Sequence, residues 1–311
     1  MSRITGLQPG PVISLGEAML ELSSRGDDLW RMGVAGDTLN TAWYLRAALP
    51  AAWSVGYLTR LGSDAFPDRI ADFIAGAGID TSAISRDPQR GCGLYAISLM
   101  NGERGFTYWR GQSAARHLAD DHDRLAQALG PARVIYLSGI TLAILTEQGR
   151  ENLLDLLRAR PKHVVLTFDP NIRPRLWSDA DMMRQTLTTF AALSDLVLPS
   201  FDDESAHFYD ISPEDTLKRY LNLGVTEVVV KNAGGPILAA SGAVLLRHDP
   251  ASVAPLDTTG AGDSFNGGYL AARLQGQSID RALCCGANLA ARVIRHPGAL
   301  IPMEQLTASG T

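Results

Sequence analysis

The chain has 311 residues, of which 46% are hydrophobic and 20% charged, the balance of a globular protein able to bury a large core. Its 28 basic and 33 acidic residues give a net charge of −5 without any basic run, which argues against nucleic acid or an anionic membrane as the main ligand. A small metabolite is the ligand that this composition favours.

The N-terminal segment and the cysteines bear on the compartment. Residues 1–10 lack the apolar stretch of a signal peptide, and no later segment has the roughly 20 apolar residues needed to cross a bilayer. Cys92, Cys284 and Cys285 cannot all pair with one another, and the last two are adjacent in an apolar helical stretch, which predicts reduced, buried thiols. We therefore expect a cytoplasmic protein with no membrane partner.

Short apolar runs alternate with helix-like segments along the chain. Such runs are typical of buried parallel strands, and apolar residues at helical spacing predict helices between them. The pattern predicts a layered α/β/α fold around a mostly parallel central sheet. The predicted strands are residues 12–15, 134–137, 164–168, 196–198 and 228–230, and the predicted helices are 151–160, 180–193, 213–223 and 265–274.

Residues 17–34 and 92–111 break this pattern. Within the second stretch, residues 93–99 and 106–110 read as two strands around an Asn101-Gly102 turn. They predict a small β-sheet lid. Because no linker rich in proline, serine or charge separates it, we expect the lid to be part of one domain that spans residues 1–311.

Three lid side chains can share one face of this hairpin, because Tyr95, Tyr108 and Arg110 alternate along its strands. Core packing would explain the tyrosines. A guanidinium on an apolar strand needs an anionic partner, and its planar fork suits a carboxylate or a phosphate. Arg173 raises the same question in a polar loop, residues 169–174, that follows a predicted strand where open α/β sheets bind ligands.

Residues 257–265, Asp-Thr-Thr-Gly-Ala-Gly-Asp-Ser-Phe, place a glycine-rich turn and a carboxylate at a predicted helix start. The N–H groups of Gly260, Ala261 and Gly262 would be unpaired first-turn donors, which attract anions. A carboxylate there would repel phosphate, so Asp263 makes sense chiefly as a base that takes a hydroxyl proton during phosphoryl transfer. The simpler reading is an ordinary acidic residue beside glycines that only shape a turn.

This string closely resembles the C-terminal signature of the ribokinase-like (PfkB-type) carbohydrate kinases. Residues 35–42, Ala-Gly-Asp-Thr-Leu-Asn-Thr-Ala, resemble the N-terminal signature of the same family, although their spacing also fits an ordinary helix start capped by Asp37 or Thr38. The resemblance implies a ribokinase-like fold with a lid, Asp263 as general base, and the amides of Gly260, Ala261 and Gly262 as an anion hole.

Further segments look like the branch of that family that acts on 2-keto-3-deoxygluconate, namely residues 36–41, 108–110, 137–145 and 173–177. The similarity runs from about Gly16 to Pro302. It implies transfer of phosphate from ATP, with Mg²⁺ on the nucleotide phosphates, to the 6-hydroxyl of this sugar acid, giving 2-keto-3-deoxy-6-phosphogluconate and ADP. Two arginines and two tyrosines over the sugar suit a sugar acid better than a neutral sugar.

Residue by residue, the resemblance implies three sets of contacts. The substrate set is Ala35, Gly36, Asp37, Thr38, Asn40, Tyr95, Tyr108, Arg110, Arg173 and Asp263, and the nucleotide set is Asn171, Arg173, Lys231, Gly234, Gly260, Ala261, Gly262 and Asn288. The metal set is Asp203 or Glu204 acting through water, since residues 200–204 are the nearest match to the family's Asn-x-x-Glu. An acidic helix first turn would explain those carboxylates equally, and a helix-packing hydrogen bond would explain Asn288.

Several alternatives stay open. A kinase of this family could instead act on 2-keto-3-deoxygalactonate or fructose, and a protein that kept the fold but lost catalysis would only bind sugar. An intact Gly-Ala-Gly-Asp sequence argues against the second alternative. A lid sheet of this kind often pairs with a second subunit, so a homo-oligomer through the lid is the macromolecular partner to consider.

Overall fold

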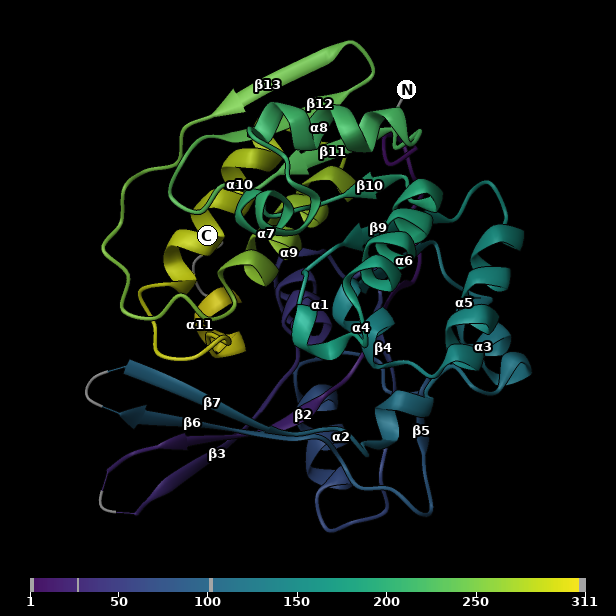
Figure 1. Ribbon diagram of the computed structural model, residues 1–311, viewed down its shortest axis with the longest axis vertical. Coiled ribbons are helices and arrows are strands. Elements are labelled where there is room, and N and C mark those ends of the chain that lie inside the picture. Colours follow the sequence, from purple (N-terminus) through teal and green to yellow (C-terminus); the bar gives the residue numbers. More distant parts are fainter. Residues whose placement is uncertain (1–2, 27, 101–102, 308–311) are drawn as a thin grey trace.

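The structure is a computed structural model that describes residues 3–26, 28–100 and 103–307. Within these residues the main feature is a nine-stranded sheet (Figure 1). All neighbouring strands are parallel except at one edge, where β11, β12 and β13 run antiparallel. The strand order is β13 (Val244–His248), β12 (Ile237–Ser241), β11 (Glu227–Val230), β10 (Leu196–Val197), β9 (Val165–Asp169), β8 (Val134–Ser138), β1 (Val12–Leu15), β4 (Val55–Leu61) and β5 (Ile84–Arg86).

Helices cover both faces of this sheet and form two separate hydrophobic cores. Strand β8 shows why, because Val134 and Tyr136 enter one core while Ile135 and Leu137 enter the other. One face carries α1 (Asp37–Ala48), α2 (Pro67–Gly76), α9 (Ala261–Leu274), α10 (Ile279–Val293) and α11 (Met303–Thr307). The other carries α3 (His122–Leu129), α4 (Gly139–Ile144), α5 (Glu147–Ala159), α6 (Ala180–Leu193), α7 (Phe201–Phe208) and α8 (Pro213–Asn222).

A second sheet of four strands projects from this α/β body, at the lower left of Figure 1. Its order is β3 (Trp30–Ala35), β2 (Met19–Ser24), β6 (Leu94–Met100) and β7 (Glu103–Trp109). Tyr95 and Tyr108 face each other across β6 and β7, with ring centroids 5.5 Å apart. On the opposite face of this lid sheet, Trp30 and Trp109 are exposed.

The fold class and the lid predicted from the sequence are confirmed. The strand predicted at 12–15 and the helix at 180–193 have those bounds in the structure. Strands β4, β5, β12 and β13 were not predicted, and the predicted turn at Asn101-Gly102 lies outside the described residues. None of the helices described is long and apolar enough to span a membrane.

Two local predictions were wrong. Helix α1 is not capped by the side chain of Asp37 or Thr38, because its N-cap is Gly36, and no described side chain caps the helix. Gly36 is needed for a close approach, since a Cβ atom there would lie 2.1 Å from the carbonyl oxygen of Glu17. The three thiols are free as predicted, but Cys92, Cys284 and Cys285 are half-buried rather than fully buried.

Candidate active site

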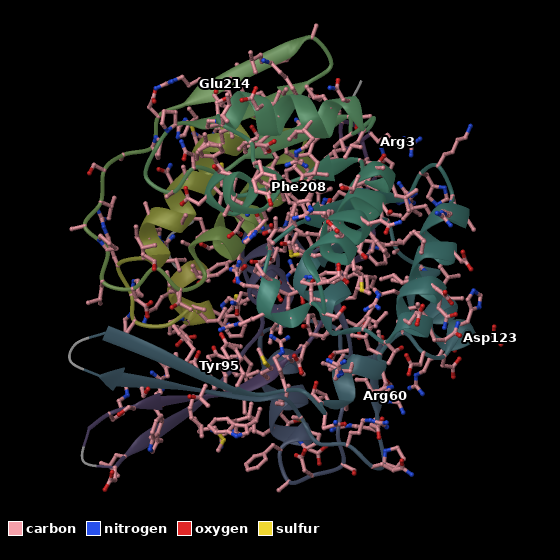
Figure 2. The ribbon with its side chains drawn as sticks, in the orientation of Figure 1. Arg3, Arg60, Tyr95, Asp123, Phe208 and Glu214 are labelled. Atoms are coloured by element: carbon pink, nitrogen blue, oxygen red, sulfur yellow. The ribbon has the colours of Figure 1, made fainter. Side chains whose placement is uncertain are left out.

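A cavity of about 480 Å³ lies between the lid sheet and the ends of strands β9 and β11. This is the edge at which parallel strands present their carboxyl ends, where α/β proteins bind ligands. Tyr95 marks the lid side of this junction in Figure 2. The walls of the cavity bring together most of the predicted site residues, namely Ala35, Gly36, Asp37, Asn40, Tyr95, Tyr108, Arg110, Asn171, Arg173, Asp203, Lys231, Gly260, Ala261, Gly262 and Asp263.

The glycine-rich turn is the start of helix α9. Gly260 is the N-cap with φ 76°, and a Cβ atom there would lie 2.9 Å from the backbone oxygen of Ala299, so only glycine suits the position. Asp257 holds the turn in place from behind. Its carboxylate accepts hydrogen bonds from the amide of Thr259 (3.0 Å) and from the amide of Gly298 (2.6 Å). Gly260, Ala261 and Gly262 line the cavity, but the prediction that all three amides are unpaired was wrong for Ala261, whose N–H donates to the carbonyl oxygen of Thr258 at 3.2 Å.

The carboxylate of Asp263 stands in the first turn of α9, half-buried at the cavity wall. Asn40 on α1 donates to its Oδ2 atom at 2.8 Å. Burial and the nearby negative charge of Asp37 raise the pKa of Asp263 to about 7, while the Asn40 hydrogen bond lowers it. A carboxylate with such a pKa is a stronger proton acceptor than an ordinary aspartate and suits a general base near neutral pH.

A polar network that the sequence did not predict supports this wall. The Oδ2 atom of Asp169, at the end of β9, accepts from Lys231 Nζ at 3.0 Å and from Asn266 Nδ2 at 2.6 Å. Lys231 also donates to Asn266 Oδ1 at 3.1 Å, and Asn266 reaches the Tyr136 hydroxyl at 3.0 Å. These contacts tie the end of β9, the loop after β11 and helix α9 together.

Two of the predicted arginines already have carboxylate partners within the protein. Arg110 Nη2 lies 2.5 Å from Oε2 of Glu17, a residue only 2% exposed that was not predicted as part of the site. Arg173 Nη1 lies 3.2 Å from Asp203 Oδ2. Arg110, which directly follows β7 of the lid, therefore has the anionic partner that it requires within the protein itself, namely Glu17.

The structure does not bring four predicted residues to this cavity. Thr38 is buried and its hydroxyl is 3.0 Å from the Tyr57 hydroxyl. Asn288 lies exposed on α10, and Gly234 lies in the loop before β12. Glu204 is fully buried on the inner side of α7, so the prediction that it serves a metal is not carried forward.

Glu204 has a structural role instead. Its carboxylate accepts from Arg219 at 2.6 Å and from the Tyr220 hydroxyl at 2.8 Å, and burial raises its pKa to about 7. Asp203, one residue earlier, does reach the cavity. Among the described residues, no group of three or more His, Cys, Asp or Glu side chains is placed to hold a metal ion.

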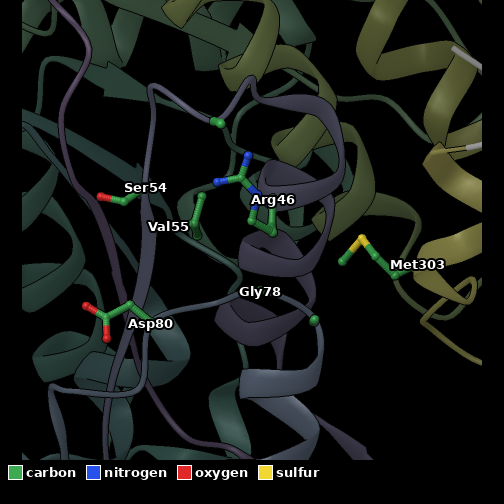
Figure 3. Close-up of a pocket in the computed structure, with 8 residues that line it drawn as sticks. Arg46, Ser54, Val55, Gly78, Asp80 and Met303 are labelled. Atoms are coloured by element: carbon green, nitrogen blue, oxygen red, sulfur yellow. The ribbon is translucent and has the colours of Figure 1, made fainter.

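A second cavity, of about 420 Å³, lies at the opposite end of α1 (Figure 3). Arg46 lines it, but its guanidinium donates to the carbonyl oxygens of Trp53 (2.6 Å) and Leu49 (2.5 Å). Asp80, also in its wall, accepts from the amide and the hydroxyl of Ser82. The two charged groups of this cavity are therefore engaged within the protein.

Comparison with known proteins assigns the class. Residues 12–306 match the pfkB family of carbohydrate kinases, so the chain belongs to that family and is a carbohydrate kinase. A protein of Dickeya dadantii (strain 3937) named 2-dehydro-3-deoxygluconokinase is 41% identical over 303 residues, which cover 94% of this chain and 97% of that protein. The resemblance stated from the sequence is thereby confirmed.

Solved structures agree on the fold. The crystal structure of a PfkB protein from Polaromonas sp. JS666 superposes with a TM-score of 0.82 at 29% identity, covering 96% of this chain and 99% of that one. The crystal structure of an E. coli protein in complex with ATP and Mg²⁺ has a TM-score of 0.80 at 22% identity, covering 96% of this chain and 99% of that one.

The raised pKa of Asp263 predicts a pH dependence for this enzyme. A general base must be ionised, so kcat/KM for the sugar at saturating MgATP should fall about tenfold per pH unit below pH 7. Because the Asn40 hydrogen bond lowers the pKa of Asp263, the Asn40→Ala variant should lose activity at a higher pH than the wild type. Initial rates between pH 5.5 and 9 test both points, and an unshifted profile in the variant would contradict them.

Proposed function

We propose that this protein transfers the terminal phosphate of ATP to the 6-hydroxyl of 2-keto-3-deoxy-D-gluconate. The products are 2-keto-3-deoxy-6-phosphogluconate and ADP. The observation that carries the substrate is the long, high similarity to a relative named for this reaction. The cavity supports it, because the base candidate Asp263 and the lid tyrosines and arginines line one space of a size suited to a small sugar acid.

Substrate binding is proposed for the residues of α1 and the lid that line the cavity. The Oδ1 atom of Asn40 is buried and has no hydrogen-bond partner among the described residues, while its Nδ2 atom is engaged with Asp263. A buried acceptor without a partner is costly, and a sugar hydroxyl would satisfy it. Asn40 would thus hold a substrate hydroxyl beside the base. Ala35, Gly36 and Asp37 would contact the sugar from the same side, and Tyr95 and Tyr108 would cover it.

The nucleotide is proposed to lie against the first turn of α9. Its terminal phosphate would meet the amides of Gly260 and Gly262, where an anion is favoured by the helix end. The amide of Ala261 would join them by giving up its hydrogen bond to the carbonyl oxygen of Thr258. Lys231, whose Nζ atom borders Gly262, would neutralise charge on the phosphates, with Asn171 and Arg173 nearby. Gly234 and the exposed Asn288 remain proposals for the adenosine part, which would extend beyond this cavity.

The magnesium ion that accompanies ATP fits the carboxylates present. Mg²⁺ prefers oxygen ligands, keeps several waters and is usually bound through one or two carboxylates plus substrate phosphates. Asp203 and Asp169 both line the cavity and could serve that role. When bound, Mg²⁺ would offset the negative charge of the phosphates during transfer.

The protein's own part in the reaction then follows from these positions. Asp263 accepts the proton of the 6-hydroxyl as the oxygen approaches the phosphorus atom. The α9 amides stabilise the negative charge on the phosphoryl group as it moves. The lid excludes water, so that the phosphoryl group goes to the sugar rather than to a water molecule.

A substrate comparison tests this function. ADP release from MgATP should be fastest with 2-keto-3-deoxygluconate when it is compared at matched concentration with 2-keto-3-deoxygalactonate, fructose and ribose. Preference for the galactonate epimer would keep the sugar-acid class and change only the stereochemistry. Preference for fructose or ribose would contradict the proposal, and the absence of turnover with all four would indicate a binding protein.

A further inference from the structure

The hydroxyl group of Tyr95 is held by a glutamate that does not itself line the cavity. Strands β2 and β6 pair in parallel, and their register places Glu21 beside Tyr95 on the face of the lid sheet that borders the cavity. The Tyr95 hydroxyl donates a hydrogen bond to Oε2 of Glu21. An ionised carboxylate accepts hydrogen bonds and cannot donate them, so the direction of this bond is fixed.

The ring of Tyr95 is held in place by its neighbours on the lid. Its centroid lies 5.5 Å from that of Tyr108 and 6.5 Å from that of Phe106, both on β7. Tyr95 is only 7% exposed and lines the cavity together with these two rings. The ring contacts and the bond to Glu21 together fix the position of the Tyr95 oxygen atom and the direction of its proton.

This bond decides what Tyr95 can offer to a ligand. A tyrosine hydroxyl has one proton to donate and lone pairs that accept, and Glu21 already takes the proton. Burial and the negative charge of Glu21 raise the pKa of Tyr95, so the proton stays on the tyrosine. Donation to a carboxylate also makes the oxygen a better acceptor, because hydrogen bonds in a chain polarise one another. A ligand group that meets Tyr95 must therefore bring a proton of its own.

The group that fits this requirement is a hydroxyl of the acceptor sugar. A keto oxygen at the same place could only accept, and it would be repelled by the lone pairs of Tyr95. The 6-hydroxyl is assigned to the opposite wall, where Asn40 and Asp263 lie 2.8 Å apart. The hydroxyls at C4 and C5 of 2-keto-3-deoxygluconate are the ones left to meet the lid.

We propose that Glu21 is a positioning residue that determines specificity through Tyr95, because it makes the lid accept a hydrogen bond from the C4 or C5 hydroxyl of the acceptor sugar. This inference rests on the proposed function, since it assumes that the sugar lies under Tyr95. An analogue without that hydroxyl leaves the Tyr95 oxygen without a donor, which costs binding. Glu21 thus selects against deoxygenated and oxidised sugars without touching the sugar itself.

The test compares 2-keto-3-deoxygluconate with the two analogues in which fluorine replaces the hydroxyl at C4 or at C5. Fluorine is close to a hydroxyl in size but cannot donate a hydrogen bond. In the wild type, KM for one of the analogues should exceed KM for the parent acid about 10- to 100-fold. In Glu21→Leu the proton of Tyr95 is free to turn towards the ligand, so this ratio should fall to within about threefold. Glu21→Gln should keep most of the ratio, since its amide oxygen accepts the same proton.

Two further variants complete the comparison. Tyr95→Phe has no hydroxyl to meet the sugar, so its ratio should also fall to within about threefold. Glu214→Leu is the matched control, because Glu214 is an exposed glutamate on α8, far from the lid sheet in Figure 2. It should keep the wild-type ratio. If Glu21→Leu keeps that ratio too, even with a higher KM for all three substrates, Glu21 only supports the lid and the inference is overturned.

Failure of the proposed function gives a different pattern. If the wild-type enzyme does not phosphorylate 2-keto-3-deoxygluconate, the substrate assignment is wrong, and the inference falls with it. If it phosphorylates this acid but has nearly equal KM values for the acid and both analogues, only the inference is wrong. Calorimetric titration of the acid and of each analogue into the wild type and Glu21→Leu should give the same ratios for Kd as for KM, since the effect lies in binding.

Discussion

The Asp263→Asn variant is expected to lower kcat by about three to four orders of magnitude while leaving the affinity for the sugar acid within a few-fold of wild type. An amide has nearly the shape of the carboxylate and can keep its place beside Asn40, 2.8 Å away in the wild type. It cannot accept the proton of the 6-hydroxyl. Loss of the base should therefore appear in kcat, because the hydroxyl is bound equally well but remains protonated.

Turnover by coupled ADP detection and sugar binding by calorimetry measure the two quantities separately. Asp123→Asn is the matched control, since Asp123 is an exposed aspartate on α3, far from the lid in Figure 2. It should change neither quantity. Near-normal turnover in Asp263→Asn would remove this residue from the role of base, and a parallel loss of sugar affinity would point to a folding defect instead.

The same substitution should stabilise the protein. The pKa of Asp263 is raised from its ordinary value of 3.8 to about 7, so the folded state holds a proton more tightly than the unfolded chain does. Its contribution to stability is therefore fully present below pH 3.8 and is lost as the pH rises through 7. The amide stays neutral, so Asp263→Asn should melt at a higher temperature than the wild type at pH 8, and the difference should shrink towards pH 4.

The Arg273→Leu variant is expected to lose about 3–5 kcal/mol of the free energy of unfolding. Arg273 on α9 donates from Nη2 to Glu227 Oε2 at 2.8 Å, and from Nε to Oε1 at 2.9 Å. Glu227, at the start of β11, is fully buried. Leucine fills similar space but leaves that carboxylate, among the described side chains, with only the Tyr269 hydroxyl at 2.7 Å as a partner.

Urea unfolding followed by circular dichroism measures this loss. The double variant Glu227→Gln with Arg273→Leu should recover part of it, because no buried charge then remains unpaired. Arg158→Leu, at an exposed position on α5, is the control for removing an arginine from a helix. A loss in Arg273→Leu no larger than in that control would show that the buried pair contributes nothing to stability.

The elements that the sequence predicted correctly share one property, which is a continuous pattern. Strand β1 is an uninterrupted buried run, Val12 to Leu15, and helix α6 has regular apolar spacing and the Asp179 cap. Strand β4 escaped prediction because Gly56, Thr59 and Arg60 interrupt its apolar residues, although it is almost wholly buried. Burial there comes from neighbours distant in sequence, which a local pattern cannot reveal.

The site follows the same rule. Most site residues within the two motifs, 35–42 and 257–265, were predicted correctly to line the cavity. Each motif contains the turn and the helix start that place its residues, so a local pattern is enough to find them. Glu17 was missed because its partner, Arg110, lies far along the chain. Glu204 was wrongly grouped with Asp203, since one residue along a helix turns the side chain by about 100°, here from the cavity wall into the core. Side-chain direction on a predicted helix needs the packing partner to be known.

Helix α9 packs so closely against helices α1 and α10 that its position cannot shift without a clash. A Cβ atom at Gly267 would lie 2.6 Å from Tyr44 of α1, and one at Gly268 would lie 3.0 Å from the backbone of α10. The lid, in contrast, would contact the proposed sugar through side chains on its own strands, such as Tyr95 and Tyr108. Evolution can therefore alter which sugar is accepted by exchanging lid residues while the machinery of transfer stays constant, and grafting a lid from one kinase of this fold onto another becomes a rational route to new acceptors.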